Sequence, residues 1–371
     1  MVVLVPRRLR QIPVGLLVVV LAACGVDGQA PGPSEPSSAA SSADASQTSP
    51  PTPGKPARTA SSTSTARADE IDHVVVVSVD GLNPQVFRVL APADVPTFTR
   101  IMAEGSFTMN ARTEYEQTLT LPDHTGMLTG RRVDAARGGH GWTADVDTGD
   151  TVHEPDGQPV PSVFDVVEEA GLSSALFANK TKFAVFERSW PSIGRYVADE
   201  DTDELVDLFL ADMFARQRSF YFVHLAPPDH AGHDHGWLSP PYLAAARQTD
   251  RLLGSILTGI DSSPELSQHT ALVVTADHGG SGTRHADATD PADYTIPFMV
   301  LGPGVPGDVD LYDLNPGRAD PGRSRPSYSG PQPIRNADVA DLVTDLLGLA
   351  PVPTSDVGAR DPLEVIGTPR P

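Results

Sequence analysis

Continuous apolar runs alternate with helical stretches along most of the chain after residue 70. The first run, His73–Val79, is apolar at nearly every position, which is typical of a strand buried on both faces. Similar runs follow at Ser174–Ala178, Phe220–Leu225, Thr270–Ala276 and Pro297–Leu301. The helical stretches between and after them are Val95–Glu104, Val163–Ala170, Asp203–Arg216, Tyr242–Leu257 and Asn336–Leu347. This alternation predicts an α/β fold with a mostly parallel central sheet and helices on both faces.

The N-terminus does not follow this pattern. Three arginines precede the apolar run Ile12–Ala23, which is too short to span a bilayer comfortably but suits a secretory signal peptide. The run ends in Leu21-Ala-Ala-Cys24, which resembles the bacterial lipobox, in which the Cys is lipidated. We therefore predict a lipoprotein signal peptide over residues 1–23 and a lipid anchor on Cys24. A plain signal peptide with an incidental Cys is less consistent with the sequence, because this is the only Cys of the chain.

Composition divides the remainder into three parts. Residues 24–68 are mostly Ser, Thr, Pro, Ala and Gly and predict a disordered linker. Residues 69–353 are expected to form the catalytic domain, with a long surface loop at Gly307–Pro333, and residues 354–371 a tail that frays after Pro351. Residues 1–68 hold six basic and three acidic side chains, which leaves 21 basic and 45 acidic side chains, a net charge of −24, for the rest.

This charge excludes a general nucleic-acid binder, which needs clustered Lys and Arg. A single Cys also excludes an intramolecular disulfide and a thiolate zinc site. We expect an acidic domain on the extracytoplasmic side of a bacterial cell membrane, which it contacts only through its lipid anchor.

Metal-binding residue types follow three of the predicted strands. Asp80 follows the first, Pro228-Asp-His-Ala-Gly-His233 follows the third, and Asp277-His278-Gly279 follows the fourth. Each could alone be a turn or a His-rich surface loop. Parallel strands end at one edge of a sheet, where such folds bind ligands. It is therefore improbable that three strands carry metal-binding residue types at this edge by chance. Carboxylates and imidazoles without thiolates favour zinc or another divalent first-row metal.

A hydroxyl nucleophile is available at Thr120. It precedes Leu121-Pro122 and a short apolar segment, so we expect it near the start of a helix. The helix N-terminus would then direct N–H groups at an anion held near the hydroxyl. The alternative interpretation is that Thr120 only caps the helix.

Four motifs together resemble a known family. Val76-Val-Ser-Val-Asp80-Gly, Thr120-Leu-Pro-Asp-His-Thr-Gly-Met-Leu-Thr-Gly130, Pro228-Asp-His-Ala-Gly-His233 and Thr275-Ala-Asp-His278-Gly are similar to the alkaline phosphatase superfamily. Within it they are most similar to the type I phosphodiesterase/nucleotide pyrophosphatase group. The similarity covers about Ile71–Pro351 and implies a phosphoester hydrolase.

The resemblance also implies roles for individual residues. It implies two divalent ions, with zinc expected, one of them held by Asp80, Thr120, Asp277 and His278. The other would be held by Asp229, His233 and a further His, for which His285 is the only choice after His278. Thr120 would attack phosphorus to give a phospho-threonine, which water then hydrolyses. His230 and His235 are expected to support the site or lie on the surface.

The sequence departs from the group at two places and leaves the substrate open. Asp145 stands where the group has a phosphate-binding Asn, and Asp123 replaces a common Asn, so a diesterase and a monoesterase both stay open. A sulfatase is excluded because it needs Cys or Ser at the nucleophile. A phosphonoacetate hydrolase-like C–P hydrolase would need a Lys for the substrate carboxylate, for which Lys180 or Lys182 is available. The non-enzyme alternative is a tethered binding lipoprotein with an inactive site.

Overall fold

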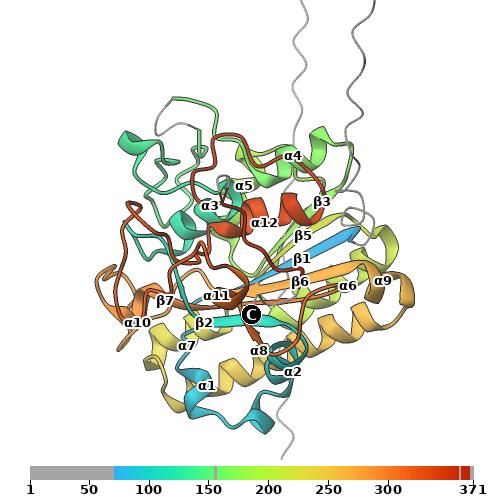
Figure 1. The fold of residues 1–371 in the computed structure, drawn as a ribbon, viewed down its shortest axis with the longest axis vertical. Coiled ribbons are helices and arrows are strands. Elements are labelled where there is room, and N and C mark those ends of the chain that lie inside the picture. The colour runs from blue at the N-terminus through green and yellow to red at the C-terminus, as the bar shows by residue number, and fades with distance from the viewer. Residues whose placement is uncertain (1–70, 154–156, 359–360, 368–371) are drawn as a thin grey trace, which may run out of the picture. The chain divides into compact units, whose positions relative to one another are not determined.

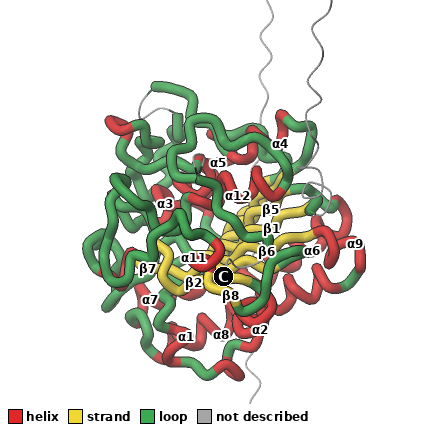
Figure 2. The backbone as a smooth tube through the Cα atoms, viewed as in Figure 1, coloured by secondary structure: helices red, strands yellow, loops and turns green. Residues whose placement is uncertain are grey.

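A computed structural model describes residues 71–153, 157–358 and 361–367. In these ranges the chain forms one eight-stranded sheet between two layers of helices (Figures 1 and 2). The signal peptide, Cys24 and the whole linker lie outside the described residues. No helix of the described part is both long and apolar enough to cross a membrane.

The sheet has the order β4-β3-β5-β1-β6-β7-β2-β8. Its strands are β1 His73–Val79, β2 Ser106–Arg112, β3 Ser174–Ala178, β4 Tyr196–Ala198, β5 Phe220–Leu225, β6 Thr270–Thr275, β7 Thr295–Leu301 and β8 Val309–Asp310. Only β7 runs antiparallel to its neighbours, β6 and β2. The predicted mostly parallel sheet is therefore confirmed.

β1 lies at the centre because its side chains can be buried on both faces. Val76 pairs with Phe222 of β5 on one side and with Val273 of β6 on the other. All three side chains are fully buried. Because β5, β1 and β6 are parallel neighbours, their carboxyl ends meet at one edge.

The helices cover both faces of the sheet. They are α1 Val86–Val89, α2 Pro96–Glu104, α3 Thr120–Thr129, α4 Val163–Glu169, α5 Ala184–Ser189, α6 Thr202–Arg216, α7 Pro227–His235, α8 Pro240–Asp261, α9 Pro264–His269, α10 Pro291–Tyr294, α11 Leu311–Leu314 and α12 Asp338–Leu346. In Figure 1, α3, α4 and α12 lie above the sheet, and α2 and α8 lie below it. The five predicted helices are confirmed to within a few residues.

The C-terminal tail differs from its prediction. The expectation that the chain frays after Pro351 is wrong for the described residues, because Leu363 and Val365 are buried. Asn315 holds this segment by donating its side-chain amide to the Glu364 carbonyl at 2.8 Å. The predicted surface loop at Gly307–Pro333 likewise contains β8 and α11.

Candidate metal centre

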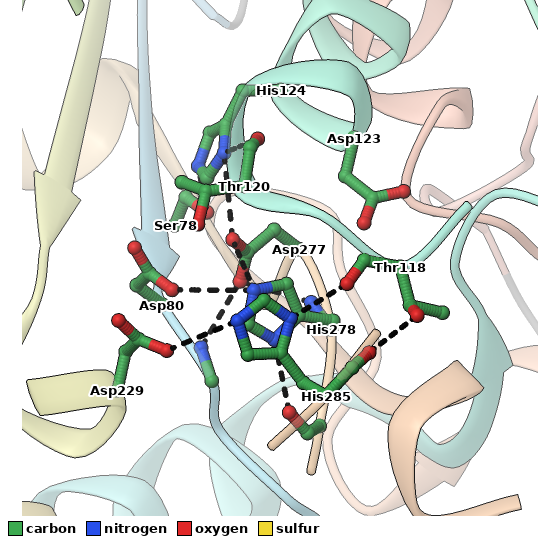
Figure 3. A network of polar contacts seen from close by, with 12 residues as sticks. Ser78, Asp80, Thr118, Thr120, Asp123, His124, Asp229, Asp277, His278 and His285 are labelled. Atoms are coloured by element: carbon green, nitrogen blue, oxygen red, sulfur yellow. Dashed lines mark hydrogen bonds and ion pairs between the residues drawn. The ribbon is translucent and has the colours of Figure 1, made fainter. Parts of the chain in front are cut away.

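Three carboxylates meet at the carboxyl ends of β5, β1 and β6 (Figure 3). Asp80 follows β1, Asp277 follows β6, and Asp229 lies in α7 just after β5. Gly81 lets these segments approach, since its φ is +70° and a Cβ there would lie 3.0 Å from Asp229 Cα. The Gly81 amide donates to Asp277 Oδ1 at 3.0 Å, which leaves the other oxygen of that carboxylate free to face the site.

One group of acceptor atoms converges on His278. Its Nδ1 lies 2.9 Å from the Gly279 carbonyl, to which a protonated Nδ1 donates, so Nε2 carries a lone pair. This Nε2 lies 3.2 Å from Asp277 Oδ2 and 3.5 Å from Asp80 Oδ1. All three atoms are buried without a hydrogen-bond partner among the described residues. Burial lowers the pKa of His278 to about 3, so the ring is neutral and suited to bind a cation.

A second group is formed by Asp229, His233 and His285, whose ligand atoms lie within 4.8 Å of one another. The His233 and His285 Nδ1 atoms lie 3.1 Å and 2.6 Å from the carbonyls of Thr283 and Thr118. If both Nδ1 atoms donate, the two Nε2 lone pairs face each other at 3.1 Å. Because two lone pairs cannot form a hydrogen bond, this arrangement fits a cation between the rings.

The two groups are adjacent. One ligand atom each from Asp229, Asp80 and His278 also lie within 4.8 Å of one another. Its Oδ1 is buried and unpartnered like those of the first group. The donor set of hard oxygens and imidazole nitrogens therefore fits two neighbouring divalent ions.

Thr120 is the first residue of α3 and is buried at the site (Figure 3). The N-cap is Leu119, whose side chain makes no capping hydrogen bond, so Thr120 is not the N-cap of this helix. His124 Nδ1 lies 2.7 Å from the Thr120 carbonyl and 3.6 Å from Asp277 Oδ2. The start of α3 is thereby held beside the first ligand group.

Asp145 occupies the anion position at the start of α3. The Leu121 amide donates to Asp145 Oδ1 at 3.0 Å, and Lys182 Nζ lies 2.8 Å from the same oxygen. Asp145 therefore lies beside the first turn of α3. In this structure the carboxylate lies where a helix N-terminus could bind an oxygen of phosphate.

Lys180 lies between the two ligand groups. Its Nζ is 2.6 Å from Asp80 Oδ2 and 2.6 Å from Asp229 Oδ2. Burial alone would raise the pKa of Asp80, but the charge of Lys180 and a hydrogen bond from His224 outweigh it and hold the pKa well below its usual range. The two carboxylates likewise raise the pKa of Lys180 despite its burial. The ammonium therefore balances the buried negative charge of the site.

His224 orients Asp80 and was not predicted from the sequence. It projects from β5 with Nε2 2.8 Å from Asp80 Oδ2, while its Nδ1 accepts from the Asn179 amide at 3.3 Å. Because the accepting Nδ1 carries no hydrogen, the hydrogen of the neutral ring is on Nε2, which donates to Asp80. The available signal was a His inside the otherwise apolar run Phe220–Leu225.

A second set of unpredicted contacts fixes Asp277. The Asn336 side-chain amide donates to the Asp277 carbonyl at 3.1 Å and to Thr113 Oγ1 at 3.0 Å. Thr113 donates in turn to Asp123 Oδ1 at 2.7 Å. Burial, together with the nearby Glu114, raises the pKa of Asp123 well above its usual range. His230 and His235 are exposed in α7 and belong to neither ligand group.

Sequence comparison gives one family and one curated relative. Residues 74–298, more than half of the chain, match the family described as type I phosphodiesterase / nucleotide pyrophosphatase. GPI ethanolamine phosphate transferase 1 of Yarrowia lipolytica (strain CLIB 122 / E 150) is 25% identical over 149 residues. The match covers 40% of this chain but only 16% of that relative.

Solved structures share the fold at low sequence identity. An inactive threonine-to-alanine variant of murine ectonucleotide pyrophosphatase / phosphodiesterase 5, in complex with AMP, is 16% identical with a TM-score of 0.55, covering 76% of this chain and 96% of that one. The lipoteichoic acid synthase LtaP of Listeria monocytogenes is 14% identical with a TM-score of 0.54, covering 76% and 73%. BT1596, a 2-O GAG sulfatase, is 15% identical with a TM-score of 0.53, covering 77% and 72%. These structures support the alkaline phosphatase-like fold.

Proposed function

The chain belongs to the type I phosphodiesterase / nucleotide pyrophosphatase family, and we propose that it is a metal-dependent phosphoester hydrolase with Thr120 as its nucleophile. The observation that carries this proposal is the set of buried, unpartnered ligand atoms beside the start of α3. Such a set is costly to bury unless cations complete it.

The residues would hold two divalent ions, for which zinc is expected. Asp80, Thr120, Asp277 and His278 would hold one, and Asp229, His233 and His285 the other. Bound ions would lower the pKa of a coordinated hydroxyl and neutralise phosphate oxygens. His224 and Asn336 would keep Asp80 and Asp277 oriented through the contacts described above.

The chain's own groups account for the bond changes. The Thr120 hydroxyl gives its proton to solvent, and its oxygen forms a bond to phosphorus while the bond to the leaving oxygen breaks. The leaving oxygen takes a proton from solvent, and water then hydrolyses the phospho-threonine to phosphate product and the free hydroxyl. During attack the Leu121 amide binds a phosphate oxygen in place of Asp145, and Lys182 remains nearby to balance the displaced carboxylate. The inactive threonine-to-alanine variant of the murine structure supports the choice of a Thr nucleophile.

Two alternatives to diester hydrolysis are each consistent with one specific feature. A cavity of about 620 Å³ beside Asp229 and His233 is lined by both Lys180 and Lys182. Two ammonium groups there favour a substrate with a second anionic group, as a monoester or a phosphonoacetate-like C–P substrate has. The similarity to an ethanolamine phosphate transferase favours transfer of the phospho group to an alcohol instead of water.

A substrate panel tests this proposal. We expect the purified protein to hydrolyse bis(p-nitrophenyl) phosphate or a nucleotide diester faster than p-nitrophenyl phosphate and phosphonoacetate, and to lose this activity in EDTA. Product analysis with added ethanolamine or glycerol separates hydrolysis from transfer. A fully metal-loaded protein that turns over none of these substrates would favour the binding lipoprotein.

We also propose that the domain is anchored by a lipid on Cys24, outside the cytoplasmic membrane. In Cys24→Ser the acceptor thiol is gone, so labelling by a fatty-acid precursor should disappear. The protein should then be released or remain as an unprocessed precursor, which fractionation and intact mass would show. Labelling equal to that of the parent chain would contradict the anchor.

A further inference from the structure

A cavity of about 820 Å³ lies beside β2 and the start of β7. Helices α1 and α2, the segment 290–295 and residues 322–323 complete its walls. None of the predicted metal ligands lines it. We propose that this cavity binds an anionic amphiphile, a molecule with one apolar body and one anionic head.

The apolar wall results from an incompletely covered sheet face. Along β2, Ser106 and Thr108 are buried on one face, whereas Phe107 and Met109 point to the other and are only half-buried. Phe87 of α1 and Met102 of α2 line the same cavity and are also half-buried, so they cover this face without closing it. Aromatic and Met side chains adapt to apolar guests of varied shape.

Two arginines supply the charge. Arg88 and Arg323 line the cavity, both are exposed, and neither guanidinium has a hydrogen-bond or ion-pair partner among the described residues. Asp290 also lines the cavity, but its oxygens already accept from the Ala292 amide at 2.9 Å and the Ser281 hydroxyl at 2.7 Å. The cavity therefore offers positive charge to an anion.

The backbone around Arg323 is held by its neighbours. Arg112 donates to the carbonyls of Gly322 at 2.9 Å and Ser324 at 3.1 Å, on either side of it. The Tyr294 hydroxyl donates to the Arg323 carbonyl at 3.3 Å. The backbone that presents this guanidinium is thus held in place before any ligand binds, which reduces the entropy lost on binding.

Size and polarity together select the ligand class. A volume of about 820 Å³ falls in the range of cavities that take drug-sized ligands. An inorganic anion would leave the apolar wall in water, and a neutral hydrocarbon would leave the two arginines unused. A single hydrocarbon or aromatic body with a carboxylate, phosphate or sulfate head matches both features.

Calorimetric titration of the full chain carrying Cys24→Ser, which removes any competing acyl group, tests this inference. The probe is decanoate below its micelle concentration, with decan-1-ol and decyltrimethylammonium as neutral and cationic controls. Decanoate should bind with one site per chain, decanol more weakly, and the cation not measurably. Equal binding of the anion and the cation, or no binding of decanoate, would overturn the proposal.

Two variants locate the site. Arg88→Gln/Arg323→Gln should weaken decanoate binding by about tenfold or more, a loss of about 1.4 kcal/mol. Decanol binding should stay unchanged, because decanol has no anionic head for the arginines to bind. Arg216→Gln/Arg251→Gln, which removes two exposed arginines elsewhere, is the matched control and should bind decanoate like the parent chain. Equal affinity of both double variants would place the bound decanoate outside the cavity. Unfolding midpoints of all variants should agree.

Discussion

Replacing Thr120 by alanine should lower turnover of every phosphoester substrate by several orders of magnitude. The change removes the oxygen that forms the bond to phosphorus and leaves both groups of Asp and His ligands in place. The hydroxyl makes no capping hydrogen bond, so the fold and unfolding midpoint should be nearly unchanged. Steady-state kinetics, with metal content and thermal unfolding measured on the same preparation, check this result.

Two variants make the Thr120 result specific. Thr120→Ser keeps a hydroxyl and should retain part of the activity. Thr125→Ala removes a hydroxyl from the same buried helix, where it donates to the Leu121 carbonyl at 2.7 Å, and should leave most of the activity. Phosphate trapped on the wild-type enzyme should map to Thr120 alone. If Thr120→Ala were as active as the parent, the enzyme would have to use direct attack by metal-bound hydroxide.

The sequence predicted those parts of the fold and site that depend on local patterns. β1, β5 and β6 are continuous apolar runs, so their ends could be located to within a residue, and the Asp residues beyond them followed. Parallel topology then required that Asp80, Asp229 and Asp277 meet. β2 was missed because Ser-Phe-Thr-Met-Asn-Ala-Arg holds only three apolar residues and forms no continuous apolar run.

The remaining features depend on contacts between distant parts of the chain. The bond from Asn336 to the Asp277 carbonyl joins residues 59 positions apart, and no local pattern encodes it. The C-terminal tail contains few apolar residues, and only tertiary contacts bury Leu363 and Val365. Lys180 was considered as a ligand for substrate, but its place between two carboxylates depends on the approach of β3, β1 and α7.

That position gives Lys180 two opposite effects on the protein. Without metal, its ammonium stabilises Asp80 and Asp229, which would otherwise be buried charges of the same sign. With divalent ions on these carboxylates, the same ammonium is a third cation at short range and is repelled. The adjoining cavity of about 620 Å³, which Lys180 lines, offers space into which it can move.

Lys180→Met should therefore destabilise the metal-free protein and strengthen metal binding. In EDTA we expect a loss of roughly 3–5 kcal/mol in the free energy of unfolding, the typical cost of removing one partner of a buried ion pair. Zinc affinity, measured by competition with a chromophoric chelator, should rise at least about tenfold, because no internal cation has to be displaced. Zinc should then restore the stability that EDTA removes.

Lys182→Met is the matched control for this variant. Its ammonium contacts Asp145 and neither Asp80 nor Asp229, so stability in EDTA and zinc affinity should both stay close to those of the parent chain. The parent chain and Lys182→Met should hold about two ions per chain, and Asp277→Ala should lose at least one because it removes a ligand. If Lys180→Met bound zinc no more tightly than Lys182→Met, the ammonium would not compete with metal. Lys180 would then stabilise the carboxylates in both states.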